Sequence, residues 1–216
     1  MNYIFNNWGP LLDGARVTLE LFFITLLLSA PLGLLLALMR ISRVRALSLA
    51  VNGYIWLMRG TPLMLQIIFI YFALPVFLGR GAALPGLATA IIAFTLNYAA
   101  YFAEIFRAGI QSIDKGQYEG ARVLGYNYTQ TMRHIVLPQV VKRILPPMSN
   151  ETITLVKDTS LVYVIALNDL LKVVRGMVLR EFSMGPFVVA AAFYLLMTLV
   201  LTWGFQYLEK RHAAYD

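Results

Sequence analysis

Residues 116–138 read GQYEGARVLGYNYTQTMRHIVLP, a largely polar stretch that separates two long apolar parts of the chain. The spacing over 117–124 predicts a short helix. One face of this helix would carry Tyr118, Ala121 and Leu124. Gly125 follows directly and suits the left-handed conformation in which many helices end. The stretch therefore begins with a helix that has a defined end.

A second helix is predicted to open at Asn127, because Gln130 three residues later completes the pattern of a capping box. We expect this helix to end before Pro138, since the residue before a proline avoids the helical conformation. Both helices lie within 107–146, a connection of about forty residues and far longer than most loops. A short helix on such a loop is suited to lying in a groove of another protein.

On either side of this loop the composition is that of a membrane-embedded protein. Of the 216 residues 59% are hydrophobic and only 13% are charged, and the mean hydropathy is +0.69. A chain of this composition would aggregate in water rather than fold as a soluble domain. The absence of cysteine excludes disulfides, thiolate metal sites and a cysteine nucleophile.

Apolar runs close to the length that crosses a bilayer, roughly 20 residues, recur five times. We therefore predict an all-α protein with a single transmembrane domain over 1–216 and spans at 17–39, 62–78, 87–106, 148–167 and 187–205. A helical lead-in over 46–58 precedes the second span, in which Thr61 is expected to cap the helix and Pro62 to occupy its first position. The fourth span is unusual because it contains Glu151, Lys157 and Asp158.

The basic residues predict the orientation. Eleven Lys and Arg fall in the loops after spans one and three and in the C-terminal tail, whereas five fall on the opposite side. Because basic residues are retained in the cytoplasm, the N-terminus is expected outside and the C-terminus inside. The segment Met1–Arg16 lacks a basic stretch before its apolar run, so we do not expect a cleaved signal peptide.

The acids of the fourth span are the first candidate binding residues. Glu151 and Asp158 are seven residues apart, so both face one side of a helix about 10 Å apart along its axis. An acid at the centre of a membrane helix costs about 3 kcal/mol, so these two should line a wet cavity or meet partners. The alternative is that Lys157 neutralises one of them within the protein.

A second polar stripe, in the third span, consists of Asn97, Tyr101 and Glu104. This stripe could face the acids of the fourth span. The alternatives are that Glu104 pairs with Arg107, that Asn97 bonds to a neighbouring helix and that Tyr101 is a core residue.

A ligand for two separated acids should carry two separated positive groups, which an amino acid with a cationic side chain does. Its carboxylate could take donors from Asn97, Thr154 or Lys157. Arg59 is more easily read as an interface anchor, and His134 and His212 lack metal-ligand spacing. No catalytic constellation occurs, so the sequence does not predict an enzyme.

The polar loop also carries a family resemblance. Glu119, Gly120 and Ala121 are followed after three residues by Gly125 and after nine more by IVLP at 135–138. This resembles the E-A-A-x3-G-x9-I-x-L-P loop of permease subunits in ATP-binding-cassette (ABC) importers, with Gly120 in place of the usual alanine. Other stretches are similar to the polar amino acid branch of that family: 14–19, RGTPL at 59–63, YFAEIFRAGI at 101–110 and KDTSL at 157–161.

The resemblance implies an amino acid importer of the bacterial cytoplasmic membrane. Its expected partners are a second permease chain, identical or not, two ATP-binding-cassette subunits, an external amino acid binding protein and membrane lipid, but no nucleic acid. The ATPase would be met by the loop residues Tyr118, Glu119, Gly120, Ala121, Leu124 and Gly125.

The cofactors ATP and Mg are expected on the partner ATPase and none in this chain, which lacks the G-x-x-x-x-G-K-[ST] phosphate loop. We predict arginine, lysine or histidine as substrate, moved by alternating access. The alternatives are glutamine or another polar amino acid, or a carrier or channel subunit driven by an ion gradient, for which the acids would be ion sites.

Overall fold

A computed structural model describes residues 8–79, 81 and 83–213 of the chain, and those residues form helices without any strand. Three helices are long and apolar enough to cross a membrane: α2 (Trp8–Arg40), α6 (Gly86–Gln111) and α11 (Gly185–Ala213). The described part of Met1–Arg16 is the start of α2, and residues 1–7 lie outside the described residues. Arg80, one of the five basic residues predicted on the outer side of the membrane, also lies outside them.

A bent pair of helices forms a fourth candidate crossing. α3 (Arg45–Gly60) and the segment Leu63–Leu78 meet at an angle of 102°. The segment consists of α4 (Leu63–Ile68), a π-helical turn (Phe69–Ala73) and α5 (Leu74–Leu78). The predicted helical lead-in is thus confirmed as α3, which is the first arm of the bend.

The predicted cap at Thr61 is wrong. Its hydroxyl donates backwards to the carbonyl of Leu57 in α3 (2.9 Å), and α4 opens after Pro62 without a side-chain cap. Thr61 therefore ends the first arm instead of starting the second. Gln66 stabilises the corner, since its amide donates to the Thr61 hydroxyl (2.8 Å) and to the carbonyl of Met58 (3.0 Å).

The prediction that a helix ends before Pro138 is also wrong. α8 (Tyr128–Thr131) runs through a π-helical turn (Met132–Val136) directly into α9 (Leu137–Asp158). Proline lacks an N–H and its ring crowds the preceding turn, and a wider turn accommodates both defects without breaking the helix. The predicted span 148–167 accordingly starts inside α9 and continues as a 3₁₀ helix (Thr159–Ile165).

α6 is the central helix. It packs along α2 and α9, and its buried side chains include the largest of the core, Phe94, Tyr98 and Phe102. Gly33 permits the close approach of α2, because a Cβ built there would lie 2.6 Å from the Cβ of Phe102. α11 differs from α6 in its burial. Only 6% of the residues in its most apolar stretch are buried, against 56% in α6, so most of α11 faces outward.

A smaller core forms at the N-terminal end of α2. Leu11 packs there with Leu170 and Val174 of α10 (Leu170–Glu181). The buried Asp169 caps α10 by accepting from the backbone N–H groups of Leu171 and Lys172 (both 3.1 Å). Thr18 of α2 accepts from the N–H of Leu170 (3.2 Å), so the start of α10 is bonded to α2.

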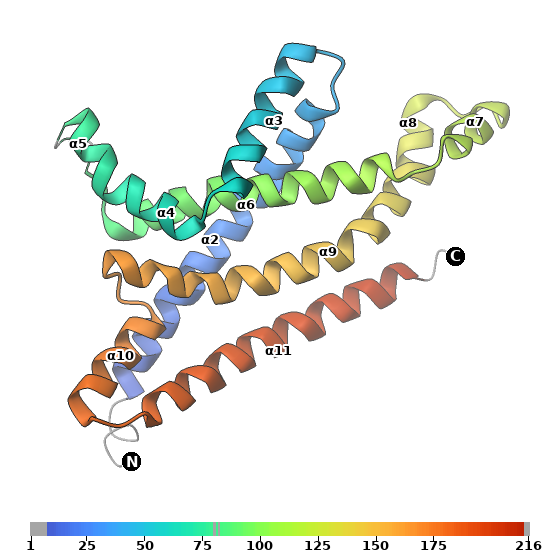
Figure 1. Cartoon of the computed structure of the whole chain (residues 1–216). Helices are drawn as coiled ribbons and strands as arrows, with labels where there is room; N and C mark the ends of the chain where they lie inside the picture. Colours follow the sequence, from blue (N-terminus) through green and yellow to red (C-terminus); the bar gives the residue numbers. More distant parts are fainter. Residues whose placement is uncertain (1–7, 80, 82, 214–216) are drawn as a thin grey trace.

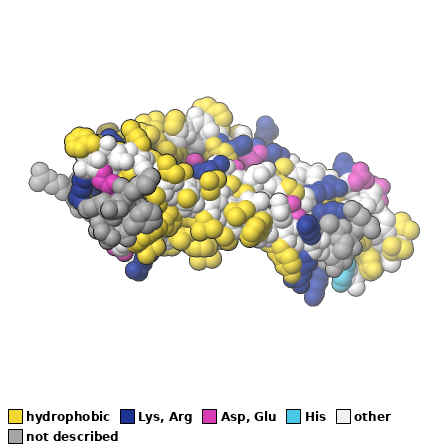
Figure 2. Space-filling view, turned by 90° about the horizontal axis from the view of Figure 1, so that it is seen from below, with side chains coloured by type: hydrophobic (Ala, Val, Ile, Leu, Met, Phe, Trp, Pro, Cys, Tyr) yellow, Lys and Arg dark blue, Asp and Glu magenta, His cyan; other side chains and the backbone are white. Residues whose placement is uncertain are grey.

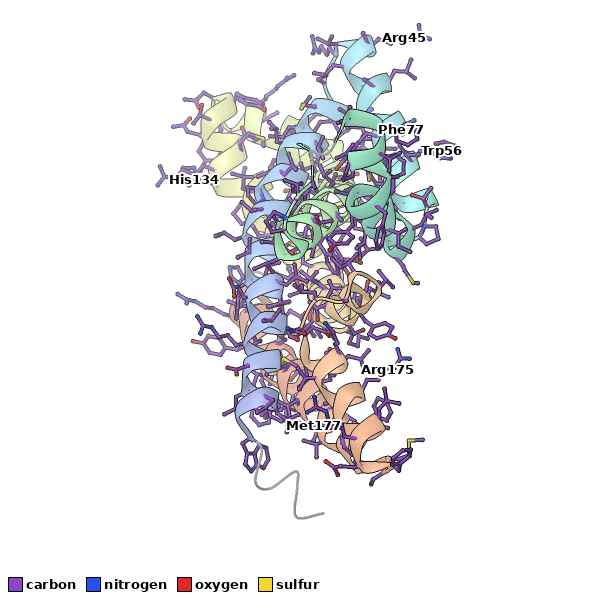
Figure 3. All side chains as sticks on the ribbon, turned by 90° about the vertical axis from the view of Figure 1, so that its left-hand side faces the viewer. Arg45, Trp56, Phe77, His134, Arg175 and Met177 are labelled. Carbon is purple, nitrogen blue, oxygen red and sulfur yellow. The ribbon has the colours of Figure 1, made fainter. Side chains whose placement is uncertain are left out.

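The helices point their ends in two directions. In Figure 1, α7 (Lys115–Val123), α8 and the C-terminal end of α11 lie on the right, whereas α5, α10 and the N-terminal end of α2 lie on the left. Figure 2 shows hydrophobic side chains across the middle of one face and a group of Lys and Arg at its right-hand end. In Figure 3, Trp56 of α3 and Phe77 of α5 lie at the edge of the molecule, and each is 75% exposed.

Candidate functional site

A cavity of about 550 Å³ opens where the α3–α4 bend meets α6 and α9. The bend contributes Arg59 and the backbone around Thr61 and Pro62. Its polar lining from the two long helices comprises Asn97, Tyr98 and Tyr101 of α6 and Glu151, Thr154 and Asp158 of α9. Five of the six predicted binding residues thus line one cavity.

The two predicted acids lie on the same wall of this cavity. Asp158 accepts a hydrogen bond from the Tyr98 hydroxyl (2.7 Å) at the end of α9. Glu151 is half-buried two turns earlier on α9. Glu151 and Asp158 therefore lie on the same side of α9, as their seven-residue spacing predicts.

Asn97 lies at the cavity, but its amide is already bonded. It donates to the carbonyl of Met58 (2.9 Å) and to the side-chain oxygen of Gln66 (3.1 Å), and the residue is 4% exposed. The alternative that Asn97 bonds to a neighbouring helix is therefore what the structure shows. It fastens α6 to the α3–α4 bend.

Lys157 is the one predicted binding residue that does not line the cavity. It is exposed, because consecutive residues on a helix are about 100° apart and the neighbouring Asp158 takes the inward direction. Internal neutralisation of an acid by Lys157 is equally absent from the ion pairs among the described residues. The Thr154 hydroxyl donates to the carbonyl of Asn150 (3.0 Å).

Glu104 lies outside this cavity, at the centre of an arginine cluster. The predicted pair with Arg107 is confirmed (2.7 Å), and Arg40 at the end of α2 contacts the other carboxylate oxygen. Arg59 is more distant, with its nearest nitrogen 3.8 Å from Glu104. A second cavity of about 400 Å³ lies between these residues and shares Arg59 and Tyr101 with the first.

Sequence reasoning missed two residues of the first cavity. The guanidinium of Arg59 lies over the Tyr101 ring, 5.1 Å from its centre. The sequence feature that could have indicated Arg59 is its position just before the helix break at Thr61–Pro62. Tyr98 belongs to an i, i+4 row of aromatics with Phe94 and Phe102, which reads as packing. The signal there is its hydroxyl, since a buried tyrosine usually needs a hydrogen-bond partner.

The predicted docking helix is present as α7. Asp114 caps it by accepting from the N–H of Gly116 (2.7 Å), and Gly125 has φ +77° as expected. The capping box of Asn127 and Gln130 at the start of α8 is confirmed by bonds of 2.9 and 3.0 Å.

The faces of α7 differ from the prediction. Ala121 is 2% exposed and Tyr118 packs against the Ile113 and Val136 cluster, so both point into the protein. Leu124 is 75% exposed because it follows the last helical residue. The outward surface includes Glu119, Gly120, Arg122, Val123 and Leu124, and His134 of the π-helical turn points away from the molecule in Figure 3.

Residues 29–213 match the family described as "Binding-protein-dependent transport system inner membrane component". The chain belongs to this family. It is therefore the permease component of an ABC importer and an integral protein of the bacterial cytoplasmic membrane, and it is not an enzyme, since ATP is hydrolysed by a separate chain. The alternative of a carrier driven by an ion gradient is thereby set aside.

Relatives cover nearly the whole permease. It is 39% identical to the "Probable glutamine ABC transporter permease protein GlnM" of Bacillus subtilis, over 98% of this chain and 97% of the relative. It is 36% identical to the "Arginine transport system permease protein ArtQ" of the same organism, over 95% and 94%. A crystal structure of "an amino acid ABC transporter with histidines" superposes with a TM-score of 0.88 at 34% identity, covering 97% of both chains.

Proposed function

We propose that this permease carries an amino acid with a cationic side chain, such as arginine, lysine or histidine, through the cavity between the α3–α4 bend, α6 and α9. One observation carries the proposal: the charged side chains that line the cavity are two acids, Glu151 and Asp158, and one guanidinium, Arg59. Their formal sum is one negative charge. A basic amino acid has one net positive charge and therefore balances the cavity.

The volume is suitable for such a ligand. About 550 Å³ lies within the range of roughly 300–1,000 Å³ that small-molecule pockets occupy. A charge in the membrane interior is costly unless it meets a partner of opposite sign. The two acids would provide these partners at two points along α9, one for the α-ammonium group and one for the side chain.

Glutamine is the second candidate, and the Tyr98–Asp158 bond favours it. If that hydrogen bond satisfies Asp158, Glu151 and Arg59 remain to bind a zwitterion without a charged side chain. One relative named above is described as a glutamine permease and another as an arginine permease, so the names support both candidates.

The test compares arginine and glutamine binding to the permease–ATPase complex in lipid nanodiscs. We expect wild type to bind arginine at least tenfold more tightly than glutamine. Glu151→Gln should weaken arginine binding about tenfold or more, which corresponds to a loss of about 1.4 kcal/mol of binding free energy. Glu20→Gln is the matched control, because Glu20 is exposed on α2 and lines no part of this cavity, and it should leave both affinities unchanged. Tighter glutamine binding by wild type would decide for the second candidate.

We further propose the topology and assembly that this transport requires. The crossings are α2, the bent segment from α3 to α5, α6, α9 with its 3₁₀ extension, and α11. α10 lies outside the membrane, and the C-terminal end of α11 lies in the cytoplasm. Two permease chains enclose the substrate, two ATPase subunits bind the outward surface of α7, and alternating access moves the substrate inward. The chain contains no cysteine, so single cysteines at Arg43, Leu179 and Lys210 can be labelled from either side to test this. External labelling only at Leu179 is the expected result, and external labelling at Lys210 would contradict it.

A further inference from the structure

We propose that Arg59 binds the α-carboxylate of the transported amino acid and that Glu104 holds Arg59 in position for it. The inference rests on the proposed function, which concerns the two acids and leaves the substrate carboxylate without a partner. Arg59 occupies the last turn of α3 and lines both cavities, so it lies between the acids of α9 and the arginine cluster around Glu104.

The three donors that the sequence suggested for the carboxylate are engaged or turned away. The amide of Asn97 donates to Met58 and Gln66, and the hydroxyl of Thr154 donates to a backbone carbonyl of its own helix. Lys157 is exposed on another face of α9. Of the described residues that line the cavity, Arg59 is the one with a positive charge.

The guanidinium of Arg59 has donors to spare. At 3.8 Å its contact with Glu104 is too long for a hydrogen bond, whereas Arg107 lies 2.7 Å from the same carboxylate and Arg40 contacts its other oxygen. A guanidinium carries five N–H donors in a planar fork that matches a carboxylate. The Cζ atom of Arg59 lies 5.1 Å from the centre of the Tyr101 ring, and this cation–π contact uses none of the five donors in a hydrogen bond to an oxygen.

Charge also favours an anion at this position. Three arginines surround the single carboxylate of Glu104, so the cluster has a formal surplus of two positive charges. Glu104 attracts Arg59 without occupying its donors, because the two tighter arginines already use the carboxylate oxygens. Glu104 is therefore a positioning residue, and Arg59 is the residue that would touch the substrate.

The experiment measures how strongly binding depends on the carboxylate. The probes are L-arginine and agmatine, which is arginine without its carboxylate, bound to the permease–ATPase complex in nanodiscs. We expect wild type to prefer arginine at least tenfold, and Arg59→Gln to reduce this preference to within twofold while agmatine affinity stays unchanged. Arg59→Lys should restore part of the preference, because it keeps the charge but loses the fork. An undiminished preference in Arg59→Gln, or an equal loss of both ligands, overturns the inference.

Arg175→Gln is the matched control, because Arg175 of α10 also stacks over a tyrosine, Tyr163, at 4.5 Å but lines no part of this cavity. It should keep the full preference for arginine. Glu104→Gln should lower the preference severalfold with agmatine affinity unchanged, and Glu104→Asp should recover it. A purely structural role of Glu104 would instead weaken both ligands together.

A second pair of probes separates this inference from the proposed substrate class. If wild type binds glutamine and not arginine, the same variants are tested with glutamine and 4-aminobutanamide, its decarboxylated analogue. Loss of the carboxylate preference in Arg59→Gln would then uphold the role of Arg59 although the basic substrate is wrong. Binding of neither arginine nor glutamine refutes both.

Discussion

The Tyr98 hydroxyl donates a hydrogen bond to Asp158 over 2.7 Å, and this bond joins the middle of α6 to the end of α9. Tyr98 is 1% exposed, whereas Asp158 is half-buried at the cavity. The bond fixes the direction of one of the two acids of the cavity. The cavity is therefore supported by its own polar contacts as well as by apolar packing.

Tyr98→Phe should destabilise the permease and should leave an oxygen of Asp158 without its donor. A hydrogen bond to a charged group contributes about 1.5–3 kcal/mol, so we expect a lower midpoint of thermal unfolding in detergent. Tyr101→Phe is the control, because its hydroxyl makes no hydrogen bond with the described residues although it lines the same cavity. Equal midpoints for both variants and wild type would contradict the proposed support.

Gly33→Ala should destabilise the contact between α2 and α6. The added Cβ would lie 2.6 Å from Phe102 Cβ and 3.0 Å from the carbonyl oxygen of Ala99, and overpacking of this kind costs about 1–3 kcal/mol. Gly53→Ala in α3 meets nothing within 4 Å and should be neutral or slightly stabilising. Thermal unfolding of the two variants side by side measures the difference, and similar midpoints would refute the tight crossing.

Gly125→Ala should impair docking of the ATPase. Its φ of +77° costs a residue with a side chain about 1–2 kcal/mol, so the end of α7 and the exposed Leu124 should shift. Gly120→Ala is the counterpart, since its position is open and helical and alanine favours a helix by about 1 kcal/mol. The amount of ATPase that co-purifies with each variant is the measurement. We expect a loss only for Gly125→Ala, and equal retention would remove the proposed role of this helix end.

Asp169→Ala should loosen the start of α10. It removes the acceptor of two backbone N–H groups, and loss of a helix cap costs about 1 kcal/mol. Asp169→Asn keeps an acceptor and should retain most of the stability. Hydrogen exchange of the Leu171 and Lys172 amides reports the effect locally, and unchanged protection in Asp169→Ala would show that the cap is dispensable.

Local patterns in the sequence were sufficient for much of the fold. The capping box at Asn127 and the left-handed Gly125 depend on neighbours within three residues, and both were predicted correctly. The break at Thr61–Pro62 was located as well, although its capping was not. Pro138 was misjudged because the compensating π-helical turn depends on how the whole segment packs, with Val136 buried against Ile113 and Val140.

The site was predictable where helical spacing alone decides. Glu151 and Asp158 share a cavity because seven residues are two turns of one helix. Arg59 and Tyr98 meet these acids across different helices, and a single sequence does not specify which helices are neighbours. Lys157 lies on another face of α9, because consecutive residues on a helix are about 100° apart.

From Tyr128 to Asp158 the chain is helical without a loop: α8, the π-helical turn and α9 follow one another directly. At about 1.5 Å per residue the path along the helix axis is some 45 Å long. This helical segment begins three residues after Gly125, and its far end bears both acids. The start of α8 is therefore connected to both acids through helical and π-helical turns alone, with no loop between them.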